Sequence, residues 1–370
     1  MIKIREIEEK DLIPVSEFLP KGFACTTKEF WLQLFEFWWI TNPAFTSQIP
    51  RGWVLEKDMS IIGFMGNIPV KFLIHGEVKI AGASNSWYVD PSVRGTYSFR
   101  LFNEFMKQKD ASLFLFKAND ERFAKILSKY KFDEYILPRN QKEYAYIIDK
   151  NKITFNFIKF IFDDEIPKLH KIPELCRRSG LLILSYLYQK QLVLMRNLPA
   201  YTVSLCTSCD DAFSTICQQN LRHCDVTISH DIKTLNWLYF SSSRCNERVV
   251  IQCRRSQDAT LAGYMVFDIL RDKRSGGGIM QLMDLCIEDK NPQVLTSLIS
   301  FAIEFGKRNG AALLVVWANN EETETYFQST FTLERSVQNY RYIKFSEPSE
   351  MNSGKVTNGK VCLPMIYPPQ

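Results

Sequence analysis

Cysteine and histidine residues cluster in one stretch of the chain, at a spacing that could bind a metal ion. Cys206 and Cys209 form a closely spaced pair in "CTSC", and Cys217, His223 and Cys224 follow. Four-ligand zinc sites normally contain two such pairs at set spacing. Here the second pair is adjacent, and the stretch has the pattern of a strand followed by a helix. We therefore predict no metal site.

Two further patterns could indicate nucleotide binding or catalysis. The glycine-rich "RSGGG" at residues 274–278 lies between two apolar runs of strand length, which is typical of a hairpin turn. His170, His223 and His230 have no Ser or Cys nucleophile at a catalytic spacing. Neither pattern predicts a site.

A long-period repeat is the clearest signal in the chain. "LFLFKANDERF" at residues 113–123 is echoed by "LLVVWANNEET" at residues 313–323, so an apolar strand, Ala-Asn and acidic residues occur twice, 200 residues apart. Gly63 in "IIGFM" and Gly263 in "LAGYM" have the same separation. Solenoid repeats have periods of roughly 20 to 50 residues, so this period indicates duplicated domains. We infer two homologous copies.

The composition is that of a packed globular protein. Of the 370 residues 46% are hydrophobic, and a net charge of +5 without a basic run argues against nucleic acid as a partner. No segment reaches ~18 uninterrupted apolar residues and the N-terminus has no signal-peptide core, so we expect a cytoplasmic protein without a membrane span. The ten cysteines are then expected to be reduced thiols.

Each copy has the same predicted order of elements: a strand, helices, a meander of strands, then helix, strand, helix and final strands. In the first copy the meander covers residues 53–89 and a helix with an apolar stripe follows. Asp11 in the first copy and Asn291 in the second are expected to cap the helices that they precede. The sequence therefore predicts a mixed α/β fold with two tandem domains, each a mostly antiparallel mixed sheet flanked by helices.

The repeat also sets the expected domain boundaries. The first copy covers residues 1–150 and the second residues 200–346. The apolar residues 151–199 between them are expected to connect the copies as packed strand and helix, with peripheral contact to a membrane as an alternative. Residues 347–370 read as a flexible tail.

At "YVDPSVRGTYSFRLF" the sequence resembles the acetyl-CoA-dependent N-acetyltransferases of the GNAT superfamily. In that family a strand ending in a Val-x-Pro-like segment leads into an Arg/Gln-x-x-Gly-x-Gly/Ala loop, which opens a helix that holds the pyrophosphate of coenzyme A. Val89, Pro91, Arg94 and Gly95 match this pattern. A helix N-terminus supplies free amides and a positive dipole end, and glycine allows close approach to phosphate.

The resemblance implies that acetyl-CoA or another acyl-CoA is the co-substrate and that the first copy binds it. Tyr97 and Phe99 stand where the family prefers Gly and Gly or Ala, which departs from its pattern. The residues implied in cofactor binding are Val89, Arg94, Gly95, Thr96, Tyr97, Ser98 and Asn119.

The family also implies catalytic residues, and the second copy supplies the candidates. Many members use a Tyr on the last helix as general acid for the departing thiolate; this position is Tyr326 in the second copy but Leu127 in the first. A base must take a proton from the attacking ammonium, and Asp284 lies on the corresponding strand. The second copy has no Arg or Gly in the place of the phosphate loop, so each copy keeps a different part of the machinery.

The resemblance therefore implies a GNAT-type N-acyltransferase that passes an acyl group from acyl-CoA to an amine of a small acceptor by direct attack. The acceptor is expected between the two domains, where small-molecule sites concentrate. One alternative is a Fem-like aminoacyltransferase that uses aminoacyl-tRNA, although no basic insertion for tRNA is present. The other is a non-catalytic binding protein of the same fold, since fold does not fix function. The sequence does not name the acceptor, the acyl length or the oligomeric state.

Overall fold

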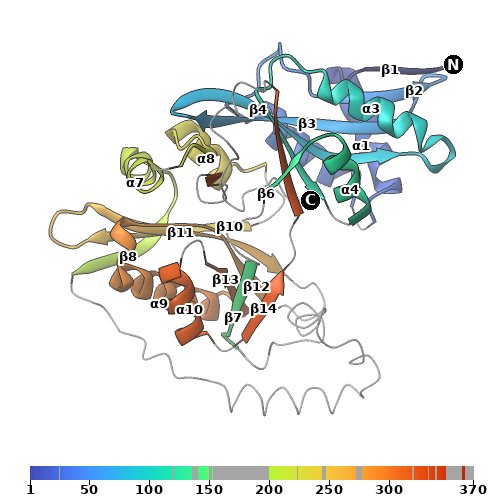
Figure 1. Ribbon diagram of the computed structural model, residues 1–370. Helices are drawn as coiled ribbons and strands as arrows, with labels where there is room; N and C mark the ends of the chain where they lie inside the picture. The colour runs from blue at the N-terminus through green and yellow to red at the C-terminus, as the bar shows by residue number, and fades with distance from the viewer. Residues whose placement is uncertain are drawn as a thin grey trace. The chain divides into compact units, whose positions relative to one another are not determined.

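Two mixed sheets organise the chain, and helices pack against each of them (Figure 1). The structure, a computed structural model, describes residues 1–24, 26–118, 121–135, 141–149, 152, 200–222, 224–243, 247–271, 277–318, 321–331, 333–337, 340–346 and 361–362. Residues 1–137, 221–245 and 339–370 form one compact unit, and residues 138–220 and 246–338 form the other. The prediction of a mixed α/β fold with two mixed sheets is confirmed.

The first sheet belongs to the first unit, and most of its neighbouring strands are antiparallel. Only β4 with β5 and β9 with β16 run parallel among the described strands of this sheet. The main path has the order β1 (Ile2–Glu6), β2 (Gly52–Lys57), β3 (Ser60–Ile74), β4 (Glu77–Val89), β5 (Leu113–Ala118), β15 (Tyr340–Phe345) and β6 (Asp133–Tyr135). Off this path lie β9 (Val226–Ile228), which pairs with β3, and β16 (Val361–Cys362).

Helices cover both faces of the first sheet. They are α1 (Leu12–Phe18), α2 (Lys28–Phe35) with a π-helical extension (Glu36–Ile40), α3 (Thr96–Met106), α4 (Glu121–Lys129) and α8 (Ile232–Phe240). Two adjacent residues of β4 show which face each covers: the ring of Trp87 stacks on Phe102 of α3, and the ring of Tyr88 contacts Phe18 of α1. Because successive side chains of a strand point to opposite faces, α3 and α1 lie on opposite sides of the sheet.

The second sheet belongs to the second unit. Its order is β14 (Leu333–Val337), β7 (Gln141–Ile147), β13 (Ala311–Trp317), β12 (Gly278–Ile287), β11 (Leu261–Arg271), β10 (Glu247–Arg255) and β8 (Tyr201–Cys206). Among these strands only β12 and β13 pair in parallel. The helices of this unit are α7 (Asp211–Leu221), α9 (Pro292–Arg308) and α10 (Glu321–Thr330).

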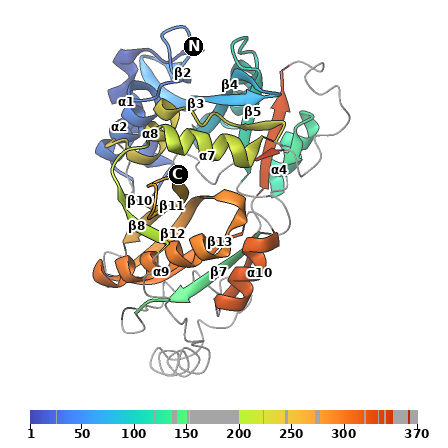
Figure 2. The ribbon, with the colours of Figure 1, turned by 90° about the vertical axis from the view of Figure 1, so that its left-hand side faces the viewer.

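The last strand of each copy lies in the sheet of the other copy. β7 follows the first copy in the sequence but pairs with β13 and β14, whereas β15 follows the second copy but lies between β5 and β6. The colours make this exchange visible: the green β7 lies among orange strands in Figure 1, and the red strand beside β5 in Figure 2 is β15. The compact units therefore differ from the sequence ranges 1–150 and 200–346 at these two strands, and also at residues 221–245, which contain β9 and α8 and belong to the first unit.

Equivalent residues of the two copies contact one another inside the first unit. The indole Nε1 of Trp237 in α8 donates to the carbonyl oxygen of Phe37 at 2.9 Å, and the two rings stack with centroids 4.9 Å apart. The hydroxyls of Thr41 and Ser241 lie 3.1 Å apart. In both pairs the residue numbers differ by 200, the period of the sequence repeat. α8 therefore packs against the helix of the first copy to which it corresponds.

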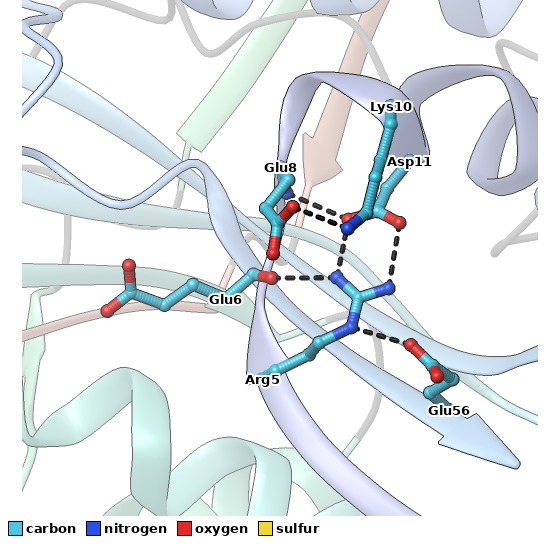
Figure 3. Close-up of polar contacts among 6 residues, drawn as sticks. All are labelled: Arg5, Glu6, Glu8, Lys10, Asp11 and Glu56. Atoms are coloured by element: carbon cyan, nitrogen blue, oxygen red, sulfur yellow. Dashed lines mark hydrogen bonds and ion pairs between the residues drawn. The ribbon is translucent and has the colours of Figure 1, made fainter. Parts of the chain in front are cut away.

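An ion network fixes the beginning of the first unit (Figure 3). The two terminal nitrogens of Arg5 donate to Asp11 at 2.5 and 2.8 Å, and Nε donates to Glu56 at 2.6 Å. Asp11 also accepts from the amide of Glu8 at 2.8 Å. Burial raises the pKa of Asp11, but the bonds from Arg5 and from that amide outweigh burial and hold it below its usual value. Asp11 is the N-cap residue of α1, as predicted, but its side chain does not bond the amides of that helix, because its carboxylate accepts from Arg5 instead.

Other predictions for single residues had mixed outcomes. The cap at Asn291 is confirmed, since its Oδ1 accepts from the amide of Gln293 at 2.9 Å. Cys224 is disulfide-bonded, so the expectation of ten reduced thiols is wrong there; spacing in the sequence does not reveal which thiols the fold brings together.

Two residues of the expected tail form β16, and residues 153–199 lie outside the described part of the chain. None of the described helices has the length and apolar character needed to cross a membrane.

Candidate functional site

The loop between β4 and α3 is built from short-range contacts. Asp90 accepts hydrogen bonds at its Oδ1 from the amide of Ser92 at 2.9 Å and from the Ser92 hydroxyl at 2.6 Å, which turns the chain directly after the strand. Gly95 has a φ of +84°, and no atom lies within 4 Å of the place that a Cβ would occupy, so the backbone is open there. A left-handed residue at this point lets α3 begin at Thr96 with its first amides free of intrahelical partners.

Arg94 supports this loop from within. Its Nε donates to the carbonyl oxygen of Val89 at 2.8 Å, and its guanidinium lies 5.5 Å from the ring centre of Tyr88. The side chain therefore joins the end of β4 to the start of α3 and stays exposed to solvent. An exposed cation beside a helix N-terminus is suited to binding an anion.

The two aromatic residues that depart from the family pattern leave the helix start accessible. Tyr97 packs against the core beneath α3, and the guanidinium of Arg100 lies 5.3 Å from its ring centre. Phe99 is 40% exposed. Thr96 is exposed and Ser98 is half-buried, so amides of the first turn remain near the surface. Asn119, the remaining predicted cofactor residue, lies outside the described residues.

β4 and β5 separate beside this loop. They pair in parallel only over residues 81–83 and 113–115, although β4 continues to Val89 and β5 to Ala118. Within the continuation, β4 has a bulge opposite Met65, where Ser86 takes a φ of +58°. Ser86 and Trp87 therefore have no paired residue in the ladders to β3 or β5. A bulge of this kind redirects backbone amides away from the sheet.

The second sheet repeats this split, but the split is closed. β12 and β13 pair only as far as Gln281 and Val315, and β12 has a bulge two residues later. There the indole Nε1 of Trp317 reaches across from β13 and donates to the carbonyl oxygen of Leu282 at 2.7 Å. Trp317 is 6% exposed, so its indole is buried where the two strands separate. The helix that follows begins with Pro292 and lacks the open glycine of the first copy.

Asp284, the predicted base, lies beside the bulge of the second sheet and faces α7. It is 8% exposed, and its Oδ1 accepts from the amide of Leu285 at 2.8 Å. Cys286, two residues further along β12, accepts a hydrogen bond from Asn220 of α7 at 3.0 Å, so both side chains point to that helix. Burial raises the pKa of the neighbouring Cys217 thiol, and the charge of Asp284 adds to this effect.

Tyr326, the predicted acid, lies on the other face of the same sheet. Its hydroxyl forms a hydrogen bond with Thr296 of α9, and burial raises its pKa above the usual value despite this bond. α9 packs on the face where a side chain at Gly263 would meet Val294, whereas the adjacent Tyr264 points to α7. The structure therefore does not bring Asp284 and Tyr326 together.

The first split contains polar side chains but no carboxylate from β4. Leu127, at the family's tyrosine position, is fully buried in the core of the first unit. The polar residues of β4 there are Ser84, Asn85 and Ser86, and the Ser86 hydroxyl donates to Oδ1 of Asn85 at 2.9 Å. Sequence reasoning missed the bulge and the position of Trp87, because no residue type in "SNSWYV" signals an extra residue in the ladder.

Known structures share this fold. Yeast (Saccharomyces cerevisiae) N-myristoyltransferase with bound myristoyl-CoA superposes with a TM-score of 0.58 at 12% identity, over 98% of this chain and 89% of that chain. A probable N-acyltransferase of Enterococcus faecalis gives 0.58 at 11% identity, over 95% and 74%. A GCN5-related N-acetyltransferase of Anabaena variabilis gives 0.57 at 8% identity, over 95% and 74%. The chain therefore has the fold of GNAT-like N-acyltransferases.

Comparison of the amino-acid sequence with known families and proteins assigns no family to the chain. No protein-family model matches the chain. No curated protein sequence is similar to it either.

Proposed function

We propose that this chain is an N-acyltransferase that uses an acyl-CoA bound to the first sheet. The observation that carries the proposal is the combination of the split between β4 and β5 with the open start of α3 at the end of β4. The second sheet has the same split but closes it with Trp317. The shared fold with N-acyltransferases, one of which was crystallised with myristoyl-CoA, supports acyl transfer as the activity.

In this proposal the residues of the first unit bind and orient the acyl donor. The amides of Thr96 to Ser98 hold the pyrophosphate at the helix N-terminus, and Arg94 keeps their loop in place. The pantetheine arm runs along β4 beyond Ala83, where the ladder to β5 ends. The backbone amides at the bulge of Ser86 and Trp87 then face the thioester carbonyl, where negative charge develops during attack.

The reaction itself is a direct displacement. The nitrogen of the acceptor amine attacks the thioester carbon, so a C–N bond forms, the C–S bond breaks and coenzyme A leaves as a thiolate. The ammonium proton must be lost, and the thiolate takes up a proton. Ser84, Asn85 and Ser86 can orient the substrate and water, but such side chains do not take up protons near neutral pH. The catalytic roles of Asp284 and Tyr326 stay a prediction.

Calorimetric titration of the purified chain with acetyl-CoA and with myristoyl-CoA tests this proposal. We expect at least one of them to bind and Arg94→Glu to weaken binding at least tenfold, because it places a carboxylate beside the phosphates. Lys107→Glu is the matched control: Lys107 carries the same charge at the other end of α3, roughly 16 Å away. Absence of binding at millimolar ligand, or equal loss in both variants, contradicts the proposal.

A further inference from the structure

The indole N–H of Trp87 is buried and has no hydrogen-bond partner among the described residues. The residue lies on β4 directly after the bulge, and its Nε1 is inaccessible to solvent. The ring stacks on Phe102 of α3 with centroids 5.6 Å apart and meets Phe123 of α4 edge-on at 5.7 Å. Buried polar groups in native proteins are nearly always hydrogen-bonded, so this donor requires an explanation.

The position of the ring connects it to the candidate acyl-CoA site. Trp87 lies beyond Ala83, where β4 leaves β5, and Phe123 lies in the first turn of the helix that follows β5. The indole therefore reaches from one of the separated strands to the element that continues the other. A donor there lies along the path proposed for the pantetheine arm.

The second copy contains an indole whose N–H has an acceptor within the protein. Trp317 also lies at the split of its sheet, and its N–H donates to the carbonyl oxygen of Leu282 at 2.7 Å. The first copy places an indole on the other strand of the equivalent split, β4, and the described residues provide no acceptor for it. A phenylalanine at this position would remove the buried donor and would keep part of the ring packing.

We infer that the N–H of Trp87 donates a hydrogen bond to an acceptor on the pantetheine and thioester arm of the bound acyl-CoA. This inference rests on the proposed function and adds a donor-binding residue to its site. The acceptors on that arm are amide carbonyl oxygens and the thioester group, all of which lie outside the nucleotide part. Trp87 thereby distinguishes an acyl-CoA from a nucleotide that carries the same phosphates.

The test compares Trp87→Phe with the unaltered chain by calorimetry, using acetyl-CoA and 3′-phosphoadenosine 5′-diphosphate as ligands. The second ligand is the nucleotide part of coenzyme A with its pyrophosphate, and it lacks the arm. We expect about tenfold weaker binding of acetyl-CoA, which corresponds to about 1.4 kcal/mol, and unchanged binding of the nucleotide. Phenylalanine removes a buried unpaired donor but is a smaller ring, so we expect only a small change in thermal stability.

A matched control is available in the same unit. Trp38 is fully buried and its Nε1 also has no partner, but its ring packs against Trp31 and Phe35 of α2. Trp38→Phe should leave the affinity for acetyl-CoA unchanged. Unchanged acetyl-CoA affinity in Trp87→Phe, or equal weakening of both ligands, overturns the inference while leaving the proposed function intact. Failure of the unaltered chain to bind acetyl-CoA or myristoyl-CoA overturns both.

Discussion

His230 should make the stability of this protein depend on pH between about 4 and 6.5. The residue lies between β9 and α8, is 7% exposed and forms a hydrogen bond with the backbone of Ile228. Burial lowers its pKa from 6.5 to about 4, although the bond to Ile228 and the charge of Asp231 oppose this shift. The imidazole is therefore neutral in the folded chain at pH 5, whereas in the unfolded chain it is protonated.

The size of the effect follows from these two pKa values. The unfolded state binds more protons than the folded state, so stability falls as the pH is lowered. With pKa values of 6.5 and about 4, His230 alone removes about 2 kcal/mol between pH 8 and pH 5, and about 3.4 kcal/mol below pH 4. Above pH 6.5 the contribution is fully present and no longer changes.

Urea unfolding of the unaltered chain and of His230→Gln at pH 8, 6, 5 and 4.5 measures this contribution. Glutamine keeps a side-chain N–H donor but does not titrate. We expect the stability of the variant relative to the unaltered chain to rise by about 2 kcal/mol between pH 8 and pH 5. His75→Gln is the control, since His75 lies exposed at the turn between β3 and β4. If the curves of the unaltered chain and His230→Gln stay parallel, the reasoning is refuted.

Substitutions at two further places test a buried ion pair in the second unit and a close ring contact in the first. Arg248 donates to Asp268 at 2.5 and 2.8 Å, with side chains 2% and 5% exposed, so Arg248→Met should cost about 3–5 kcal/mol of unfolding free energy, and adding Asp268→Leu should restore most of it. A single-variant loss below about 1 kcal/mol would contradict this. Gly22→Ala places a methyl group about 2.3 Å from the ring of Tyr88 and should cost about 1–3 kcal/mol. The double variant with Tyr88→Ala should remove that penalty if the clash is its cause.

Local signals in the sequence predicted most of the helices and strands and their order, but not β9 or β16. The two Ala-Asn motifs follow strands of the predicted type, and Asn291 caps its helix because a short polar side chain can reach the free amides of the first turn. A tertiary contact explains why the carboxylate of Asp11 does not bond the amides of α1. Arg5 on the neighbouring strand competes for its carboxylate, and the sequence does not contain that competition.

The strand exchange and the bulges lay beyond sequence reasoning. The pattern of β7 indicates a strand, but alternation of side chains does not specify which sheet the strand joins. The bulge at Ser86 depends on the register of β4 against β3, which is a property of the pair. Asp284 and Tyr326 do not form one site for the same reason, because the face on which each side chain lies follows from strand register and from helix packing.

The two copies differ at the point where their parallel strands separate, and this difference supports the proposal that the first copy binds the ligand. Wherever parallel strands separate, buried backbone groups need partners. The second copy supplies one with the indole of Trp317, whereas the residue 200 positions earlier in the first copy is Lys117, which has no indole. The first copy instead leaves the donor of Trp87 unpaired and keeps the open helix start beside Arg94. These features arise from different elements, yet a single bound acyl-CoA would satisfy both.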